Sequence, residues 1–188
     1  MRSFLFVPGD STRKFESAKK TAADALILDL EDSIAPDQKV VARGITREML
    51  DARNPEQKLY IRVNALDTDL TLGDLAAVMP GKPDGIVLPK CAGAADVNKL
   101  ALYLDAFEAA SGIAQGTTRI ITVATETARA VLKILDFENM SPRLWGMMWG
   151  AEDLAASLGA TRNRTDGRYH SPFIRSEEHT SELQSPRV

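Results

Sequence analysis

Short runs of apolar residues alternate along this chain with longer segments in which apolar residues recur every three or four positions. A short apolar run bounded by turn residues is typical of a buried β-strand, whereas the longer recurrence is typical of an amphipathic helix. Six apolar runs predict strands, at residues 3–7, 25–30, 59–63, 85–88, 119–124 and 144–149. Six periodic segments predict helices, at residues 12–20, 37–53, 69–79, 95–110, 127–135 and 151–158.

Turn and capping residues set several of these boundaries. The Pro8–Gly9 turn closes the first strand, and Ser11 or Thr12 can cap the helix that follows. Gly112 and Gly159 lie just beyond predicted helix ends, where glycine is common. The residues predicted to face inward from three of the helices are Phe15, Ala18, Val40, Val41, Ile45, Leu50, Val97, Leu100, Leu104 and Phe107.

The strict alternation of strands and helices predicts a parallel sheet covered by helices. Polar residues follow the carboxyl ends of several strands, which is where both the closed (β/α)8 barrel and the open doubly wound sheet place their sites. No glycine-rich phosphate-binding fingerprint follows the first strand, since residues 8–13 read PGDSTR. The sequence therefore favours an α/β TIM barrel, and because about six of the eight β/α units are present, we expect an incomplete one.

The last segment differs abruptly from the rest of the chain. From Ser176 onward the sequence reads SEEHTSELQSPRV, which is polar and has no apolar periodicity. It resembles the translated adapter sequence that contaminates some genome assemblies, and the alternative is a disordered natural C-terminus. We therefore interpret residues 1–175 as a truncated barrel domain, with the native frame expected to end near Arg175, and residues 176–188 as a non-native or disordered tail.

Composition narrows the class of protein. The chain has 188 residues, of which 44% are hydrophobic and 26% charged, and these values suit one globular core. With a net charge of -3 and scattered basic residues, the sequence predicts no nucleic-acid partner. A single cysteine, Cys91, excludes an internal disulfide and fits a cytoplasmic protein. No apolar run is long enough for a membrane span, and Pro8 interrupts the N-terminal apolar segment too early for a signal peptide.

Acidic residues follow three of the predicted strands: Glu31 and Asp32, then Glu126, then Glu152 and Asp153. Because the carboxyl ends of parallel strands meet at one rim, Glu126 and Asp153 can reach a common cation. Two carboxylates completed by water and substrate oxygens make a typical Mg²⁺ site. The alternative for all three later residues is a carboxylate at a helix start, where the helix dipole favours negative charge.

Four charged residues around the other strand ends are further candidates. Glu31 and Asp32 can hold metal-bound water or tune proton affinities, and the alternative is a solvated loop rim. Arg62 lies within an apolar strand and can bind a carboxylate or stabilise an enolate oxygen. Its alternative role is a structural ion pair with Glu31 or Asp32, and both roles can hold at once. Lys90 can contact substrate or a neighbouring carboxylate, with a Schiff-base role less favoured.

The remaining polar and aromatic residues are weaker candidates. Cys91 has no neighbouring histidine and is predicted to be inert, while His170 and His179 lie in a loop and in the tail. Four basic residues of the first helix favour a solvated face: Arg13, Lys14, Lys19 and Lys20. The large residues around the sixth strand are predicted to lie in the core: Trp145, Met147, Met148 and Trp149.

Six motifs carry a resemblance to a known family: RSFLFVPGD, LILDLEDSI, YIRVN, GIVLPK, ETA and WGAEDLAASLG. Each motif alone is weak, but six in this order are specific. The chain resembles the HpcH/HpaI aldolase and citrate lyase beta subunit family over residues 2–175, and in particular its citrate lyase beta subunit-like branch. The resemblance implies a (β/α)8 barrel that binds Mg²⁺ and makes or breaks a carbon–carbon bond next to a coenzyme A thioester, as citryl-CoA or malyl-CoA lyases do, releasing acyl-CoA and a 2-oxo acid.

The resemblance also implies roles for individual residues. Glu126 and Asp153 match the metal ligands, which favours Asp153 over Glu152. The implied catalytic residues are Arg62, Glu31 and Asp32, and the implied substrate-binding residues are Arg62, Glu126, Lys90, Arg13 and Lys20.

Two departures from the family pattern set the competing interpretations. Thr125 stands where the family usually has an apolar residue, and the last two strands and a late acidic catalytic residue have no counterpart in the sequence. We therefore expect the catalytic base to lie beyond this chain, a homo-oligomer (trimer or hexamer) at full length, and an insoluble or inactive isolated chain. The alternatives to the lyase are a thioester hydrolase, a CoA-independent 2-oxo acid aldolase, and a non-catalytic subunit or inert fragment.

Overall fold

The computed structural model describes residues 1, 3–137, 140–166 and 168–169 of the chain. Six strands form one sheet: β1 (Phe4–Pro8), β2 (Ala25–Asp29), β3 (Lys58–Arg62), β4 (Gly85–Leu88), β5 (Arg119–Val123) and β6 (Leu144–Met148). The α-helices are α1 (Thr12–Ala18), α2 (Lys39–Asp51), α3 (Thr71–Val78), α4 (Ala94–Ala110), α5 (Ala128–Leu132) and α6 (Ala151–Ser157). Single 3-10 turns cover Pro36–Gln38, Met79–Gly81 and Ile134–Phe137, and a small antiparallel hairpin pairs β7 (Arg164–Thr165) with β8 (Arg168–Tyr169).

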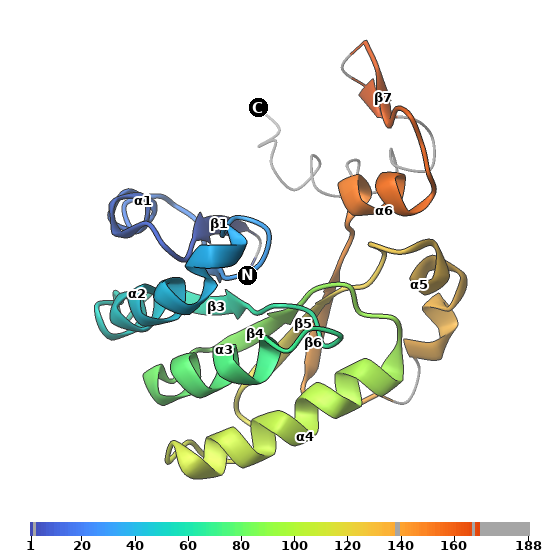
Figure 1. Ribbon diagram of the computed structural model, residues 1–188. Helices are drawn as coiled ribbons and strands as arrows, with labels where there is room; N and C mark the ends of the chain where they lie inside the picture. Colours follow the sequence, from blue (N-terminus) through green and yellow to red (C-terminus); the bar gives the residue numbers. More distant parts are fainter. Residues whose placement is uncertain (2, 138–139, 167, 170–188) are drawn as a thin grey trace.

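The sheet is parallel throughout, and its spatial order β1-β2-β3-β4-β5-β6 follows the order of the sequence. A helix connects each strand to the next, so the predicted strand–helix alternation is confirmed. Helices α1 to α4 lie along the outer side of the curved sheet (Figure 1). This is the arrangement of six consecutive units of a (β/α) barrel, which confirms the predicted fold class.

The side chains of each strand alternate between two separate apolar clusters. On β2, Leu26 and Leu28 join the large cluster under the helices, whereas Ala25 and Ile27 join a smaller cluster on the opposite face. The helix-side cluster includes Phe15, 1% exposed, so the inward face predicted for the first helix is confirmed. Because successive strand residues point to opposite faces, the two clusters define an outer, helix-covered face and an inner face of the sheet.

The inner face curls far enough for the first and last strands to approach each other. The ring of Phe4 on β1 lies 6.4 Å from the ring of Trp145 on β6, measured between centroids. Tyr60 of β3 contacts both, at 5.7 Å from Phe4 and 6.3 Å from Trp145. The six strands therefore form an arc of a barrel and not a flat sheet.

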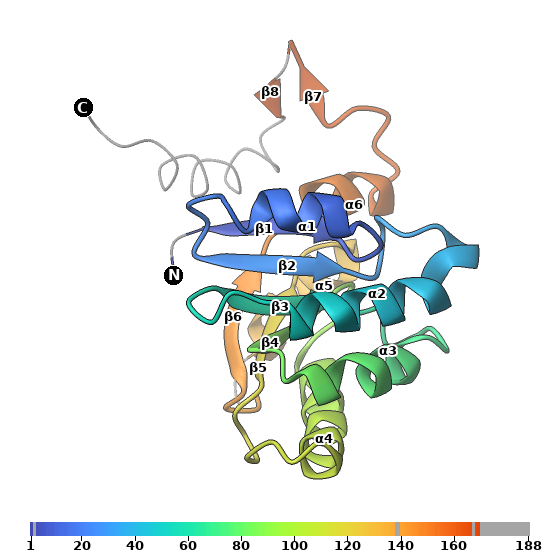
Figure 2. The same cartoon turned by 90° about the vertical axis from the view of Figure 1, so that its left-hand side faces the viewer.

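The two margins of this arc are open within the described residues, where β1 pairs only with β2 and β6 only with β5 (Figure 2). The prediction that the large residues of the sixth strand lie in the core is wrong for three of them. Trp145 is 46% exposed, Met147 44% and Trp149 42%, while Met148 packs partly against the inner cluster. An edge strand with no partner on one side leaves such residues in solvent, although their apolar run resembles that of a buried strand.

A second correction concerns α2. Val40 and Val41 are 69% and 57% exposed, so they are not part of the buried face that the sequence predicted. The buried residues of this helix are Ala42, Thr46, Met49 and Leu50, at three- and four-residue spacing. The two valines lie off that stripe. By contrast Val97, Leu100 and Leu104 of α4 are buried as expected.

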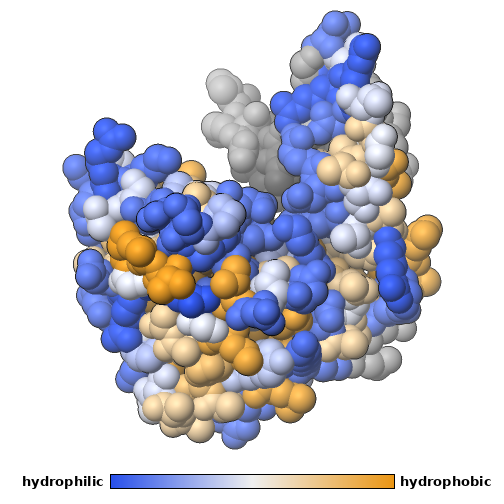
Figure 3. Space-filling model, in the orientation of Figure 1, coloured by the Kyte–Doolittle hydropathy of each residue, from blue (hydrophilic) through white to orange (hydrophobic). Residues whose placement is uncertain are grey.

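Three sequence interpretations fall on residues 170–188, which lie outside the described residues: the boundary at Arg175, the tail from Ser176, and the loop position of His170. In the described part of the chain, none of the helices has both the length and the apolar character needed to cross a bilayer. Hydrophilic side chains dominate the surface around α6 and β7, whereas hydrophobic patches occur on the lower part of the same face (Figure 3).

Candidate active site

Strand alternation brings Asp29 and Arg62 together at the carboxyl end of the inner face. Asp29 follows the inner-face residues of β2, Arg62 follows Tyr60 on β3, and the two are direct partners in the β2–β3 register. Arg62 Nε donates to Asp29 Oδ1 at 2.7 Å, and Arg62 Nη2 donates to Asp29 Oδ2 at 2.8 Å. Such a bidentate pair fixes the orientation of the guanidinium as well as its position.

The same carboxylate also holds the loop after β2. Asp29 Oδ1 accepts a hydrogen bond from the backbone N–H of Glu31 at 2.9 Å, and Oδ2 accepts one from Ser33 N–H at 3.1 Å. Asp29 is only 2% exposed. Burial acts to raise its pKa, but the hydrogen bonds and charge of Arg62 outweigh burial, so the pKa of Asp29 lies below its ordinary value. One ionised carboxylate thus positions both Arg62 and the acidic loop.

The third guanidinium nitrogen of Arg62 faces the acidic loop itself. Nη1 lies 3.0 Å from Glu31 Oε2 and 3.5 Å from Asp32 Oδ2, and the guanidinium carbon lies 5.0 Å from the ring centroid of Phe6. The structural ion pair that the sequence offered as an alternative is therefore present, with Asp29 as its principal partner. The Nη1 side is the part of Arg62 directed at the rim, so a substrate anion would have to meet Arg62 there.

Lys90 contacts three of the carboxylates. Its ammonium lies 2.5 Å from Glu31 Oε1 and 3.7 Å from Asp32 Oδ1, and its backbone N–H donates to Glu126 Oε2. Lys90 adopts φ of 50°, a left-handed conformation that is costly for a residue with a side chain and is typical of functional sites. Burial acts to lower the pKa of Lys90, but Glu31 outweighs it and raises that pKa, so the amine stays protonated. A lysine with a raised pKa favours the charged form, which suits anion binding better than Schiff-base formation.

Glu31 and Glu126 are both buried, at 4% and 3% exposure. Burial raises the pKa of Glu31, against the opposing effects of Lys90 and Arg62. Burial, together with the neighbouring carboxylates Glu31 and Asp153, raises the pKa of Glu126 to about 7. The structure therefore brings Glu126 and Asp153 together, close enough to disfavour a negative charge on both.

Glu152, the other acidic residue at the start of α6, points elsewhere. Its carboxylate accepts hydrogen bonds from Asn163 Nδ2 and Arg164 Nη2, both at 2.6 Å, on the side of the β7–β8 hairpin. The geometry therefore distinguishes Asp153 from Glu152, which the spacing in the sequence did not. In the described ranges of the chain, no three His, Cys, Asp or Glu side chains converge as a protein-only metal site would require. Mg²⁺ commonly binds through one or two carboxylates and keeps several waters, so the pair formed by Glu126 and Asp153 is a candidate for it.

Two predicted substrate-binding residues do not join this cluster. Arg13 lines a separate hollow between β1 and α1, and Lys20 is exposed beyond the end of α1. Neither forms an ion pair within the described part of the chain. Cys91 is buried, and burial raises the pKa of its thiol to about 11, in agreement with the inert role predicted for it.

Sequence reasoning missed three contributors to the site. Asp29 was overlooked as a partner of Arg62, although the parity of apolar residues along β2 and β3 could have placed both on the inner face. Lys39 of α2 donates to the carbonyl oxygens of Leu30 and Glu31, at 2.9 and 2.5 Å. Thr125 accepts a hydrogen bond from Gly150 N–H at 2.9 Å. The Lys39 contacts span eight and nine residues and the Thr125 contact spans 25, and no local pattern signals any of them.

The chain is similar to proteins of known activity. A sequence profile of the family described as HpcH/HpaI aldolase/citrate lyase matches residues 2–175. A (3S)-malyl-CoA thioesterase of Cereibacter sphaeroides strain KD131 is 36% identical over 166 residues, covering 88% of this chain and 53% of that protein. An L-malyl-CoA/beta-methylmalyl-CoA lyase of Rhodobacter capsulatus is 36% identical over 180 residues, covering 92% and 55%. The chain thus spans about half the length of these curated relatives.

Solved structures share its fold. The citrate lyase beta subunit of Mycobacterium tuberculosis, complexed with oxaloacetate and magnesium, superposes with a TM-score of 0.74 at 33% identity, covering 96% of this chain and 72% of that one. The protein CitE of the same organism, in complex with magnesium, acetoacetate and coenzyme A, gives a TM-score of 0.75 at 33% identity, covering 97% and 62%.

Proposed function

The chain belongs to the HpcH/HpaI aldolase/citrate lyase family, and from this membership we propose that it carries the magnesium-binding rim of a carbon–carbon lyase. The proposed substrate is the CoA thioester of a hydroxy acid, of the citryl-CoA or malyl-CoA type, which yields acyl-CoA and a 2-oxo acid. The observation that carries the proposal is the convergence of Glu126, Asp153 and Lys90 beside Arg62 at the carboxyl rim of the sheet. The names of the malyl-CoA lyase relative and of the magnesium-bound citrate lyase beta subunit support it.

The residues at this rim fit a hard divalent cation. Glu126 has a pKa of about 7 because it is buried beside other carboxylates, and a cation between Glu126 and Asp153 would relieve that repulsion. The carboxylates that gather at this rim are Asp29, Glu31, Asp32, Glu126 and Asp153, and the cationic side chains that contact them, among the described residues, are Arg62 and Lys90. Carboxylate oxygens in excess of nearby cations are the donor set that Mg²⁺ prefers.

Each of the chain's own residues has a separate task in this proposal. Bound at Glu126 and Asp153, Mg²⁺ would supply Lewis-acid polarisation of the oxygens of the 2-oxo acid portion. Asp29 accepts from Nε and Nη2 of Arg62, which leaves Nη1 to bind a substrate carboxylate or the thioester oxygen. Lys90 holds Glu126 through its backbone N–H and Glu31 through its ammonium, and so keeps both carboxylates turned toward the rim.

The reaction breaks the bond between the hydroxyl-bearing carbon and the α-carbon of the thioester. The hydroxyl loses its proton, its carbon becomes the carbonyl carbon of the 2-oxo acid, and the electron pair of the broken bond passes to the thioester as an enolate. The enolate then takes up a proton at the α-carbon to give acyl-CoA. A positioned charge such as that of Arg62 typically stabilises a developing oxyanion by on the order of 3 kcal/mol.

Turnover assays on matched variants test this function. Because the isolated chain is expected to be inactive, a full-length version is incubated with malyl-CoA or citryl-CoA and Mg²⁺, and acyl-CoA and 2-oxo acid are quantified together. Glu126→Gln with Asp153→Asn should abolish release of both products, whereas Glu152→Gln, which alters a carboxylate directed away from the rim, should leave them unchanged. Wild-type turnover in the double variant would refute the ligand assignment.

A thioester hydrolase is a second candidate, because a (3S)-malyl-CoA thioesterase is as similar to this chain as the lyase is, at 36% identity. Hydrolysis breaks the carbon–sulfur bond and releases free CoA and the intact hydroxy acid, whereas the lyase reaction leaves the thioester intact. Free thiol measured with a thiol reagent and 2-oxo acid measured as its hydrazone therefore separate the two activities. Cleavage of a free hydroxy acid without CoA would instead indicate a CoA-independent aldolase.

We also propose the extent of the domain, the cellular location and the oligomeric state of the protein. The family match ends at residue 175, which supports a barrel domain over residues 1–175 followed by an unrelated tail. We expect a cytoplasmic protein that forms a homo-oligomer, a trimer or hexamer at full length, with no nucleic-acid or membrane partner. Light scattering on a size-exclusion column measures the oligomeric state directly.

A further inference from the structure

The ladder between β5 and β6 continues beyond its last backbone pair through a side chain. The final backbone bond runs from Ala124 N–H to the carbonyl of Met148, at 2.9 Å. Past this point the hydroxyl oxygen of Thr125 accepts a hydrogen bond from Gly150 N–H, also at 2.9 Å. Thr125 is 3% exposed, so this bond is shielded from competing water.

This hydrogen bond joins the two segments that carry the proposed metal ligands. Thr125 immediately precedes Glu126, and Gly150 is the N-cap of α6, which has Asp153 in its first turn. The backbone at Gly150 also packs closely against Glu126 and leaves no room for a side chain. A Cβ at this position would lie 2.3 Å from Glu126 Cγ and 3.0 Å from Val123 Cγ1. The segment that carries Glu126 and the start of α6 are therefore packed tightly. The hydrogen bond from Gly150 to Thr125 fixes the position of one along the strand direction relative to the other.

We propose that Thr125 is a positioning residue that sets the separation of Glu126 and Asp153, and through it the affinity of the rim for a divalent cation. The inference rests on the proposed magnesium site and adds to it a residue that does not touch the cation. An isosteric valine would fill the same space but could not accept the Gly150 N–H. Mutation of a residue that orients a metal ligand without binding the metal itself typically lowers metal affinity by about 10- to 100-fold.

The chain contains a matched control three residues before Thr125, within β5. Thr122 is completely buried, and its hydroxyl has no hydrogen-bond partner among the described residues. Thr122→Val and Thr125→Val are thus the same substitution three residues apart, and only the second removes a bond between the turn after β5 and the start of α6. Thr125→Ser keeps the hydroxyl and loses only a methyl group.

The experiment measures Mn²⁺ binding by electron paramagnetic resonance, with Mn²⁺ replacing Mg²⁺ at oxygen ligands, and amide hydrogen exchange at Gly150 in metal-free protein. We expect Thr125→Val to weaken Mn²⁺ binding by about tenfold and to accelerate Gly150 exchange. Thr125→Ser should restore both, and Thr122→Val should leave both at wild-type values.

Equal Mn²⁺ affinity in wild type and Thr125→Val, or an equal loss in Thr122→Val, would overturn the positioning role while leaving the magnesium site intact. A wild-type chain that binds no Mn²⁺ would overturn the magnesium site, and the positioning role with it. Thermal melting of each variant, run in parallel, identifies a loss of binding that comes from unfolding. If Thr125→Val is not folded at the assay temperature, Thr125→Ala and the Gly150 exchange rate of the serine variant provide the same comparison.

Discussion

Asp29 and Arg62 face each other across neighbouring strands, and Asp29 accepts two hydrogen bonds from Arg62, of 2.7 and 2.8 Å. The pair lies on the inner face of the sheet, with side chains 3% and 13% exposed, so solvent screens it little. The remaining nitrogen, Nη1, is left to face Glu31 and Asp32. The arginine is therefore part of the framework of the barrel rim and part of the proposed site at the same time.

Asp29→Asn should destabilise the chain strongly. Asparagine has nearly the same shape but cannot accept from Arg62, Glu31 and Ser33 together, and it leaves the buried guanidinium without its main counter-charge. Removing one partner of a buried ion pair costs about 3–5 kcal/mol. The measurement is the free energy of unfolding in urea.

The matched control is Asp51→Asn. Asp51 pairs with Arg47 at 3.2 Å on the surface of α2, with side chains 59% and 34% exposed. Exposed pairs contribute about 0–1 kcal/mol, so this variant should unfold close to wild type. Similar losses in the two variants would mean that Asp29 is no more than a surface charge.

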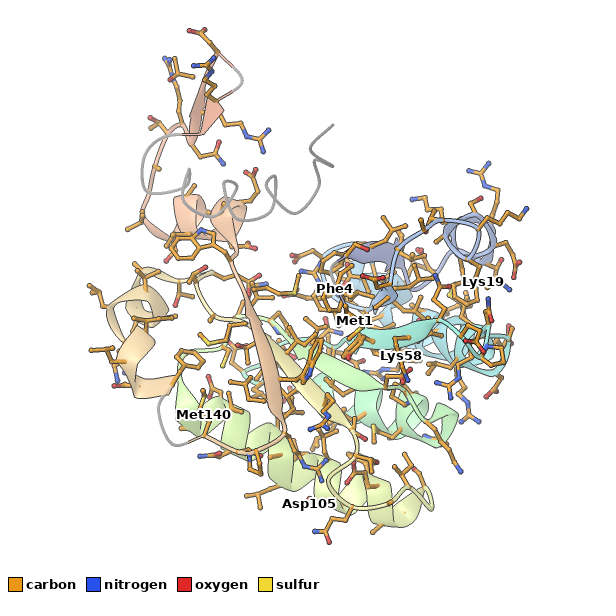
Figure 4. The ribbon with its side chains drawn as sticks, turned by 180° about the vertical axis from the view of Figure 1, so that it is seen from behind. Met1, Phe4, Lys19, Lys58, Asp105 and Met140 are labelled. Carbon is orange, nitrogen blue, oxygen red and sulfur yellow. The ribbon has the colours of Figure 1, made fainter. Side chains whose placement is uncertain are left out.

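A second buried ion pair, between Glu108 and Arg143, makes the stability of the chain depend on pH in the acid range. Glu108 of α4 accepts hydrogen bonds from Gly116 N–H and Thr118 N–H, both at 2.8 Å, and from both Nη atoms of Arg143. Asp105, labelled on the same helix in Figure 4, adds a contact to Arg143. The cluster ties α4 to the start of β5 and β6.

The pKa of Glu108 sets the pH range of this stabilisation. Burial acts to raise it, but Arg143 and the backbone N–H groups outweigh burial and lower it to about 2. A carboxylate whose pKa is lower in the folded than in the unfolded state stabilises the fold. This stabilisation is complete at a pH above the pKa of the unfolded state, and it is lost as the pH falls through the pKa of the folded state. For Glu108 the stabilisation is lost between pH 4.5 and about pH 2. Its size is on the order of 3 kcal/mol.

Glu108→Gln should therefore lower the free energy of unfolding most at pH 6, and the difference from wild type should shrink as the pH falls from 4.5 to 2. Urea titrations at a series of pH values measure this difference. Glu16→Gln is the control, because the Glu16 side chain is 58% exposed in its pair with Lys19. A difference that is constant over the whole range would contradict the lowered pKa of Glu108.

The sequence predicted the elements and the gathering of Glu31, Arg62, Lys90, Glu126 and Asp153 because both depend on local rules. Apolar periodicity identifies strands and helices, and parallel strands bring their carboxyl ends to one rim. The failures occurred where a residue depends on a neighbour in space. Trp145 follows the apolar pattern of a buried strand, yet it is exposed because β6 has no outer partner among the described strands.

Contacts between strands show the same limit. The pairing of Asp29 with Arg62 depends on the β2–β3 register, which no motif specifies. The bond between Thr125 and Gly150 follows a register shift between β5 and β6 that begins at Ile120 and Ile121. The sequence marked Thr125 as a departure from a family pattern, and only the structure shows what its hydroxyl contacts.

Gly150→Ala should displace Glu126 and weaken divalent-cation binding by at least tenfold, in line with other changes that move metal ligands. The reason is steric, because a Cβ at Gly150 would lie 2.3 Å from Glu126 Cγ. Gly146→Ala is the control on β6, since a Cβ there meets no atom within 4 Å. Isothermal titration with Mg²⁺ measures both. Unchanged binding in Gly150→Ala would show that Glu126 can move aside without loss of the ligand geometry.

The last prediction concerns the curvature of the sheet. The chain has two tryptophans, both on or next to β6 and exposed to a similar degree, 46% for Trp145 and 42% for Trp149. Only Trp145 contacts other rings in the described residues, those of Phe4 and Tyr60 across the inner face. Aromatic pairs of this kind contribute about 0.5–1.5 kcal/mol each beyond area burial.

Trp145→Ala should therefore cost about 1–3 kcal/mol of unfolding free energy, for two lost ring contacts, and Trp149→Ala clearly less. Each variant also leaves a single tryptophan, so acrylamide quenching of fluorescence reports the exposure of the one that remains. If the two variants unfold at the same urea concentration, the contact between β1 and β6 does not hold the arc closed, and the six strands form a more open sheet than the ring distances indicate.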